Sequence, residues 1–253
     1  MRDYTVSSVV KAAEVLQFIK DNQSATFSQI QNGLGYAKSS TFQILKTLES
    51  LHFISSNQYG TYFLGYKLFE LGSAYEKNAS WRKIAVPYIQ KASEDTGMTL
   101  HISIMAEDTV ICIEKFPGRI FTMQLTAVGE PLPMHTSASA KVLLAWQPPE
   151  KQDQILDRIE YKRFTDKTIV TKEDLKLELA RVKKLGYALD DQESEENCRG
   201  VARPLFACNG TILASVSMGA PIILMKQDDM LRYTEVLKTY LDEVSPLLPP
   251  ATS

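Results

Sequence analysis

One short stretch near the start of the chain, residues 24–65, constrains the fold more than any other. It contains a short amphipathic segment marked by Phe27, Ile30 and Leu34, a turn with two glycines, a second amphipathic segment from about Lys38, and two short β-type runs. This order predicts helix, turn, helix and hairpin. That arrangement is a winged helix-turn-helix, a fold that most often binds DNA.

Apolar spacing predicts which sides of the helices face a core. A helix over residues 6–19 precedes the motif, and its apolar row is expected to be buried: Val9, Ala13, Leu16 and Ile19. The helix from Lys38 has a comparable row that we also expect in the core, and it consists of Phe42, Leu45 and Leu48, helped by Ile44 and Leu51.

The opposite side of the helix from Lys38 is polar. Its stripe carries Ser39, Gln43, Lys46, Thr47 and Ser50. Hydroxyls, amides and ammonium groups contact phosphates and base edges in the major groove, and a helix N-terminus can hold a phosphate. We therefore predict DNA contacts from the helix and from the hairpin tip, or wing: Lys38, Ser39, Ser40, Thr41, Gln43, Lys46, Thr47, Gln58 and Tyr59.

Charge alone does not decide whether this head binds DNA. Residues 1–65 hold five Lys or Arg against four Asp or Glu, a net charge of +1, and residues 66–253 hold 23 against 26. This basic footprint is weak for a DNA-binding protein. The polar stripe could also be an ordinary solvated face, or the head could contact proteins. A dimer would double the phosphate contacts, so oligomerisation is part of the hypothesis.

Composition is typical of a cytoplasmic protein. The 253 residues, 44% of them hydrophobic, suffice for one large or two modest cores. The three cysteines have no CxxC spacing and are expected in a reducing compartment. We expect no signal peptide and no membrane span. The residues also suggest no metal site and no cofactor.

Residues 66–80 predict a linker helix with two apolar sides. Leu68, Leu71 and Tyr75 form one row, and Tyr66 and Phe69 lie beside it. A helix with apolar side chains on two sides is usually packed against something. We favour pairing with a second protomer, and docking onto the chain's own domain is the alternative.

Residues 81–253 predict an α/β domain. We expect strands over residues 100–105, 110–116, 187–190, 205–208 and 211–219, the last two joined by the Asn209-Gly210 turn. We expect helices over residues 83–95, 135–146, 150–159, 172–185 and 225–244, with Thr171 and Asp174 as a capping box.

Three features of this domain indicate a ligand site. His135 and Ser137 lie where a helix follows a Pro-rich loop, and hydroxyls with uncapped N–H groups there could bind a carboxylate. Asp190, at a strand end, offers an acceptor for a hydroxyl or amine. Ser215 and Ser217 give one strand an unusually polar face. Each has a structural alternative, as helix cap, turn residue or sheet hydroxyls.

Ordered motifs along nearly the whole chain resemble the IclR-type bacterial transcription regulators. They are Ala37–Ser40, Leu48, Tyr62–Gly65, Leu68–Gly72, Ala85–Pro87, Thr96-Gly97, Gly129–His135, Lys141–Ala145, Lys184–Ala188 and Asp190–Glu193. The resemblance implies an α+β protein of two domains: a winged helix-turn-helix over residues 1–65, a linker helix over 66–80, and a GAF-like effector-binding domain over 81–253. It also implies a homodimer or homotetramer on a palindromic operator in double-stranded DNA.

The family resemblance further implies regulation, most often repression, controlled by a small metabolite that is commonly a carboxylic acid. Its effector pocket corresponds here to Ala138, Ser139, Asp190, Gly200, Ser217 and Gly219.

This sequence departs from the family pattern in both domains. In the head, Gln43 replaces a usual Arg and Ser40 a usual Thr, so the operator sequence is expected to differ. In the pocket, members often have Gly-Ala at Ala138-Ser139, Cys at Gly200 and Ser at Gly219, and they have Gly at Asn197. The identity of the effector therefore does not carry over.

An enzyme is the competing class. A pocket with His135, Ser137 and Asp190 could process a small molecule, but no GxSxG elbow frames the serine. Cys198 beside Arg199 could be a reactive thiol, although such a pair is usually incidental. The sequence contains no P-loop, GxGxxG or HExxH motif. A DNA-binding regulator is the better interpretation, and a protein-interaction adaptor ranks last.

Overall fold

The computed structural model describes residues 5–77, 80–120 and 126–250, with the side chains of residues 75–77 outside the description. The chain divides into two compact units, Met1–Ala79 and Ser80–Ser253. We describe each unit by itself. Tyr75, assigned to an apolar row of the linker helix, is among the side chains not described.

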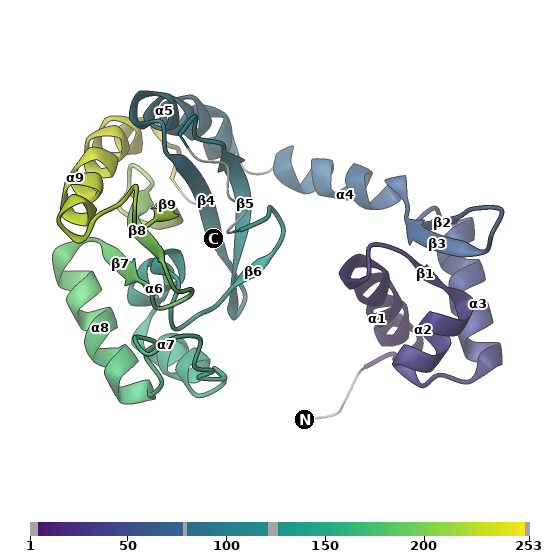
Figure 1. Cartoon of the computed structure of the whole chain (residues 1–253). Helices are drawn as coiled ribbons and strands as arrows, with labels where there is room; N and C mark the ends of the chain where they lie inside the picture. The colour runs from purple at the N-terminus through teal and green to yellow at the C-terminus, as the bar shows by residue number, and fades with distance from the viewer. Residues whose placement is uncertain (1–4, 78–79, 121–125, 251–253) are drawn as a thin grey trace. The chain divides into compact units, whose positions relative to one another are not determined.

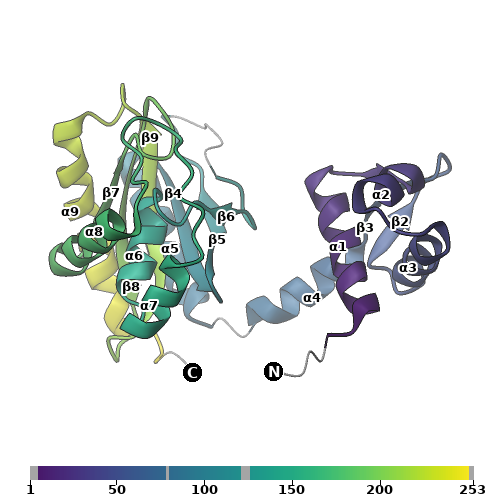
Figure 2. The same cartoon turned by 90° about the horizontal axis from the view of Figure 1, so that it is seen from below.

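The first unit is a three-helix head with a small sheet and a helix that follows it (Figures 1 and 2). Strand β3 lies between β1 and β2, and both pairings are antiparallel. The elements are α1 Ser7–Asp21, β1 Ala25–Thr26, α2 Phe27–Leu34, α3 Lys38–Ser50, β2 Ile54–Ser56, β3 Thr61–Leu64 and α4 Tyr66–Lys77.

Local chemistry sets the ends of α2. The backbone N–H of Thr26 donates to Gln29 Oε1 over 2.8 Å, and Gln29 N–H donates to the Thr26 hydroxyl over 3.4 Å, which makes a capping box. Gly35, with φ of 68°, ends the helix in the left-handed conformation. The turn between α2 and α3 is therefore encoded by a Thr, a Gln and a Gly.

The core of the head differs from the predicted rows. Val9 is 65% exposed, and the buried side of α1 centres on Val15 and Ile19. Phe42 is 55% exposed, whereas Thr41 is fully buried beside the apolar row of α3. The Thr41 hydroxyl donates to Ala37 O over 3.2 Å, so its burial leaves no polar group unsatisfied. The prediction was wrong because it ranked residues by hydrophobicity alone. Ala13 and Leu51 are also exposed.

Gly65 joins the wing to α4. A Cβ at this position would lie 2.1 Å from His52 O, which no real side chain allows. The close approach is held by a hydrogen bond from Gly65 N–H to Phe53 O over 2.7 Å and by one from Lys67 N–H to His52 O over 3.3 Å. The start of α4 is thus fixed to the backbone that leads into β2.

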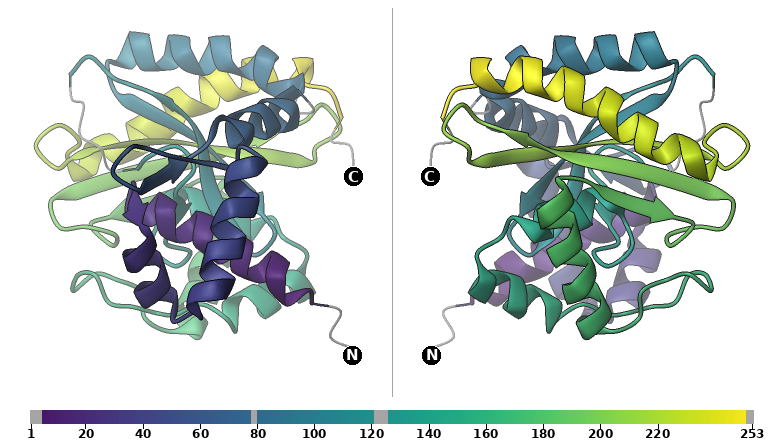
Figure 3. Two further views of the ribbon diagram at one scale, coloured as in Figure 1. Left: turned by 90° about the vertical axis from the view of Figure 1, so that its right-hand side faces the viewer. Right: turned by 90° about the vertical axis from the view of Figure 1, so that its left-hand side faces the viewer.

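The second unit is a sheet between two layers of helices (Figures 1 and 3). Its elements are α5 Ser80–Thr96, β4 Thr99–Ala106, β5 Thr109–Phe116, β6 Pro131–Leu132, α6 Ala138–Ala145, α7 Pro149–Leu156, α8 Lys172–Leu185, β7 Ala188–Asp191, β8 Cys198–Phe206, β9 Ile212–Pro221, α9 Gln227–Val244 and a 3-10 turn at Ser245–Leu247.

Among the described residues of this unit, the strands run β6-β5-β4-β9-β8-β7, and the pairings between them are antiparallel. Helices α5 and α9 cover one face, where the largest buried cluster lies. Helix α6 packs on the other face together with α8. Alternate side chains of β9 point to opposite faces of the sheet. Val216 and Met218 belong to the apolar cluster under α5 and α9, so Ser215 and Ser217 project toward α6.

Four predicted boundaries in this unit were wrong by three residues or more. The helix assigned to residues 83–95 begins at Ser80, and the helix assigned to residues 150–159 ends at Leu156. The strand assigned to residues 205–208 begins at Cys198, and the helix assigned to residues 135–146 begins at Ala138. The first part of β8 was not predicted because it contains Gly200 and Pro204, and both glycine and proline are uncommon in strands. β7 pairs with β8 only up to Ala202, so Pro204 lies where β8 has a partner strand on one side alone.

Candidate functional site

The polar stripe of α3 faces solvent within its unit. Ser39, Gln43, Lys46 and Thr47 are all exposed, as is Lys38 at the helix start. Lys46 Nζ lies 2.8 Å from Glu49 Oε2, and the Thr47 hydroxyl donates to Gln43 O over 2.8 Å. The stripe can therefore meet a partner, but Glu49 already balances part of the Lys46 charge.

Two of the residues predicted to contact DNA are less accessible in the structure than expected. Thr41 is fully buried, so its prediction as a DNA contact was wrong. Ser40 is half-buried and lines a groove between α1 and α3 together with Gln43 and Thr47. Phe42, expected in the core, instead lies on the outward stripe, since it is three residues from Ser39.

The wing is a tight turn with an exposed tip. Asn57 Oδ1 accepts hydrogen bonds from the backbone N–H of Tyr59 over 2.9 Å and of Thr61 over 3.1 Å. Gly60 has φ of 73°, which a glycine allows without strain. Tyr59 is 79% exposed and Gln58 is also exposed, so both predicted wing contacts point away from the head's core.

A cavity of about 240 Å³ opens in the second unit between the sheet and the start of α6. Of the nine residues predicted for effector binding, six line it: Ser137, Ala138, Asp190, Gly200, Ser217 and Gly219. They come from α6 and its N-cap, from β7, from β8 and from β9. Residues far apart in sequence are thus brought to one place.

The remaining three predicted residues do not line this cavity. His135 is buried elsewhere: its Nε2 lies 2.9 Å from Lys162 O, and its ring packs against Tyr161 and Phe164. Ser139 and Ser215 are almost fully buried, and within the described residues their hydroxyls have no hydrogen-bond partner. The structure therefore corrects these three placements.

Sequence reasoning missed several lining residues. The most buried polar side chain among them is His101 on β4, which is 7% exposed, and others are Glu130, Pro131, Ser194, Cys198 and Arg199. The alternation of His101 and Ser103 with apolar neighbours in β4 was visible in the sequence. Nothing in the sequence, however, showed that β4 pairs with β9 and so joins His101 to Ser217.

The cavity rim is rich in carboxylates. Glu130, Asp190 and Glu195 line it, whereas the lining guanidinium of Arg199 donates to Asp191 Oδ1 over 2.6 Å and to Met225 O over 3.1 Å. Burial raises the pKa of Asp190. Its Oδ1 accepts from the N–H groups of Glu193 over 2.7 Å and Ser194 over 3.2 Å, so Asp190 also shapes the loop after β7.

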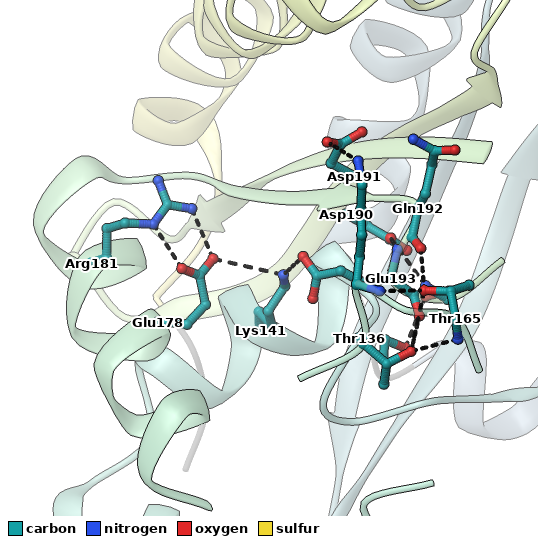
Figure 4. Close-up of polar contacts among 12 residues, drawn as sticks. Thr136, Lys141, Thr165, Glu178, Arg181, Asp190, Asp191, Gln192 and Glu193 are labelled. Carbon is teal, nitrogen blue, oxygen red and sulfur yellow. Dashed lines mark hydrogen bonds and ion pairs between the residues drawn. The ribbon is translucent and has the colours of Figure 1, made fainter. Parts of the chain in front are cut away.

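Figure 4 shows a buried ion network next to this loop. The Lys141 side chain is fully buried, and its Nζ lies 2.6 Å from Glu193 Oε1 and 3.7 Å from Glu178 Oε1. Burial raises the pKa of Glu193 to about 7 despite the ammonium beside it. Glu178 is also bound by Arg181. The network ties α6, α8 and the loop after β7, which carries Glu193.

The start of α6 leaves backbone donors for a ligand. Ser137 is the N-cap residue, but its hydroxyl does not cap the helix. In the described part of the chain, Lys141 N–H, which donates to Ser137 O over 2.9 Å, is the first α6 amide with a backbone acceptor. The preceding amides and the helix dipole favour an anion at this end of the cavity.

The catalytic alternatives find no geometric support. The His135 ring bonds to Lys162 O and not to Ser137. Burial raises the pKa of the Cys198 thiol, the opposite of what a nucleophilic cysteine needs. Over the described residues, no cluster of His, Cys, Asp or Glu side chains could hold a metal ion, and no helix is long and apolar enough to cross a membrane.

Comparison with known proteins decides the family. The model for the C-terminal domain of bacterial IclR transcriptional regulators matches residues 73–246, and that of the IclR helix-turn-helix domain matches residues 8–57. The chain belongs to the IclR family. An IclR-family relative, the regulator KdgR of Dickeya chrysanthemi, is 31% identical over 95% of this chain and 79% of its own. The repressor AllR of Escherichia coli K12 is 25% identical over 92% and 87%.

Solved IclR-family structures have the same fold. The Thermotoga maritima IclR structure has a TM-score of 0.74 and 29% identity, covering 95% of this chain and 98% of its own. An IclR homologue from Microbacterium hydrocarbonoxydans, solved with 4-hydroxybenzoate, has a TM-score of 0.82 and 22% identity, covering 94% and 98%. The predicted two-domain fold is confirmed. This IclR-family chain is a DNA-binding transcriptional regulator and not an enzyme.

Proposed function

We propose that this regulator is a repressor that binds a palindromic operator as a homodimer or homotetramer and is controlled by a small hydroxylated carboxylic acid. Residues 1–65 bind DNA in this proposal, residues 66–80 link, and residues 81–253 bind the effector. The proposal includes action in the cytoplasm, where the DNA is. The observation that carries it is a cavity with free helix-end donors on one side and carboxylate acceptors on the other.

The cavity chemistry supports a hydroxy acid. The α6 amides near Ser137 and Ala138 suit a carboxylate, whereas Asp190 and Glu130 suit hydroxyl groups that donate hydrogen bonds. A carboxylate placed against Asp190 would meet like charge. Among the relatives, AllR is named a repressor and the Microbacterium homologue was solved with 4-hydroxybenzoate, a hydroxylated carboxylic acid.

The DNA contacts in this proposal are residues of α3 and the wing that are exposed or, for Ser40, half-buried: Lys38, Ser39, Ser40, Gln43, Lys46, Thr47, Gln58 and Tyr59. A gel-shift with the DNA upstream of the protein's own gene tests them, and we expect a specific complex that weakens as salt rises. Lys46→Ala should weaken binding to all sequences, and Gln43→Ala should relax preference at one base pair by about 1–3 kcal/mol.

Two results would contradict the proposal. One is equal affinity for upstream DNA and random duplex. The other is wild-type binding by both variants, which would remove α3 from the interface. Thr41→Val is the matched control on the same helix, because Thr41 is buried and its substitution should leave sequence preference unchanged.

Oligomerisation is supported by exposed apolar side chains in the first unit. On α4, Tyr66 is 65% exposed, Phe69 79% and Leu71 48%, and on α1 Val9 is 65% exposed. Large apolar groups in such numbers on one small unit are typical of an interface. We propose that a second copy of the chain covers them.

A further inference from the structure

We use inner wall for the part of the cavity that is lined by one pair of residues on neighbouring strands. His101 on β4 and Ser217 on β9 are directly opposite in the antiparallel register, and both line the cavity. Side chains of such a pair project to the same face of the sheet, a few ångströms apart. Here that face is the one covered by α6, so the pair lies beneath the helix end described above.

Polar atoms around this pair lack partners. Within the described residues His101 Nε2 makes no hydrogen bond, although His101 is 93% buried. The next pair on the same face, Ser103 and Ser215, is fully buried, and among the described residues its hydroxyls also have no hydrogen-bond partner. Buried polar atoms are nearly always hydrogen-bonded. Unlike the two serines, His101 reaches the cavity, so a bound molecule can supply its partner.

The inner wall carries no charge at neutral pH. Burial, together with the Lys115 ammonium, lowers the pKa of His101 to about 4, so its imidazole is neutral. Lys115 is its neighbour on β5. The lining Arg199 is engaged by Asp191 and Met225. A neutral imidazole offers one donor and one acceptor, which match a hydroxyl or carbonyl group better than a carboxylate.

We propose that His101 and Ser217 form an inner subsite that binds a hydroxyl group of the effector, and that His101 selects effectors by this group. The inference rests on the proposed function, since it assumes that this cavity binds the effector. The effector then lies with its carboxylate at the start of α6 and a neutral polar group at the sheet.

The test uses three pairs of acids that differ by one hydroxyl: lactate and propanoate, 3-hydroxybutanoate and butanoate, and 4-hydroxybenzoate and benzoate. Calorimetry would measure the binding of each to the full chain and to His101→Phe and His101→Gln. We expect the wild type to prefer the hydroxylated member of at least one pair by roughly tenfold, the value of one good hydrogen bond. His101→Phe should lose that preference, and His101→Gln should keep part of it.

A second measurement uses the unmodified chain. The protein has three histidines, His52, His101 and His135, so imidazole nitrogen NMR can follow each of them. The preferred acid should shift the His101 resonances and leave those of His135, which lies outside the cavity lining, unchanged. His135→Phe is the matched control, and it should retain the preference.

The outcomes separate the inference from the proposed function. If an acid binds, but the preference survives in His101→Phe and the His101 resonances do not move, the inner subsite is wrong and the effector cavity stands. If acids bind with no preference for a hydroxyl, the selecting role of His101 is wrong. If no acid binds, the proposed carboxylic-acid control fails, and the subsite fails with it.

Discussion

In α3, whether a side chain is buried does not follow from its hydrophobicity alone. Phe42 is exposed on the outward stripe, whereas Leu45, three residues later, is 1% exposed in the core. Leu45→Ala should lower the opening free energy of α3 by about 2–5 kcal/mol, because it leaves a cavity. Phe42→Ser should change it by less than about 0.5 kcal/mol. Amide hydrogen exchange within α3 measures both values. A large effect of Phe42→Ser would contradict the exposed position of Phe42 and indicate that its side chain is part of the core.

Asn197 illustrates how a departure from the family pattern is accommodated. The family usually has Gly here, and the structure gives Asn197 a φ of 63°, in the left-handed region. Asn is among the few residues with a side chain that tolerate this conformation. The departure therefore leaves the loop between β7 and β8 in its glycine-like conformation.

His101 also predicts a pH dependence of stability. Its folded-state pKa of about 4 lies below the ordinary 6.5, so between these values the unfolded chain binds more protons. The His101 contribution is complete above pH 6.5 and is lost as the pH falls toward 4, by roughly 3 kcal/mol in all. Wild type should thus lose more stability than His101→Gln between pH 7 and 5.

Urea unfolding followed by tryptophan fluorescence measures this difference, because both tryptophans, Trp81 and Trp146, belong to the second unit. Glu193 acts in the opposite direction, since its raised pKa makes stability fall as the pH rises from 4.5 to about 7. It is present in both proteins and cancels in the comparison. Equal losses in the two proteins would show that His101 titrates normally.

At the scale of elements, the Lys141 network holds α6, α8 and the loop after β7 together. Lys141→Met would leave the buried Glu193 without its cation, and we expect a loss of about 3–5 kcal/mol in the unfolding free energy of the second unit. Adding Glu193→Gln should recover much of this loss, because the uncompensated charge disappears. Glu178 keeps Arg181 as its partner in both variants.

The exposed pair of Lys176 with Asp153 provides the control for this network. Lys176→Met should cost less than about 1 kcal/mol, as surface ion pairs contribute little. Tryptophan fluorescence during urea unfolding reports each value. If the double variant were no more stable than Lys141→Met alone, charge pairing would not be the reason that Lys141 is buried.

Elements with explicit ends could be predicted from the sequence, and those without could not. Helix α8 matches its predicted range because Thr171 accepts a hydrogen bond from Asp174 N–H and Gly186 takes a φ of 77° at its end. The start of β8 was missed because Gly200 and Pro204 interrupt its pattern. The cavity was predicted only in part, because the sequence of a strand does not show which other strand it pairs with. Thus Ser217 was found and its neighbour His101 was not.

At the scale of the whole molecule, each head supplies little positive charge, so operator binding should depend on a second copy. Phe69→Lys places a charge on the proposed interface, and Phe69 is 79% exposed, so the fold should survive. We expect sedimentation to give a mass near the monomer value of 28.4 kDa and gel-shift affinity to fall at least tenfold.

Leu177→Lys is the matched control, because Leu177 is 71% exposed on α8 in the other unit. It should leave both mass and affinity unchanged. An oligomeric Phe69→Lys variant with normal affinity would place the interface elsewhere. A monomeric variant with normal affinity would show that one head suffices for the operator.

The junction at Gly65 has a mechanical consequence. Because Gly65 N–H and Lys67 N–H donate to Phe53 O and His52 O, we expect a rotation of α4 to displace the backbone segment before β2 as well. We therefore expect α4 and the backbone segment before β2 to move together. A small rotation of α4 would then tilt the wing residues Gln58 and Tyr59 with it. Gly65→Ala should separate α4 from this segment, because the added methyl group would clash with His52 O.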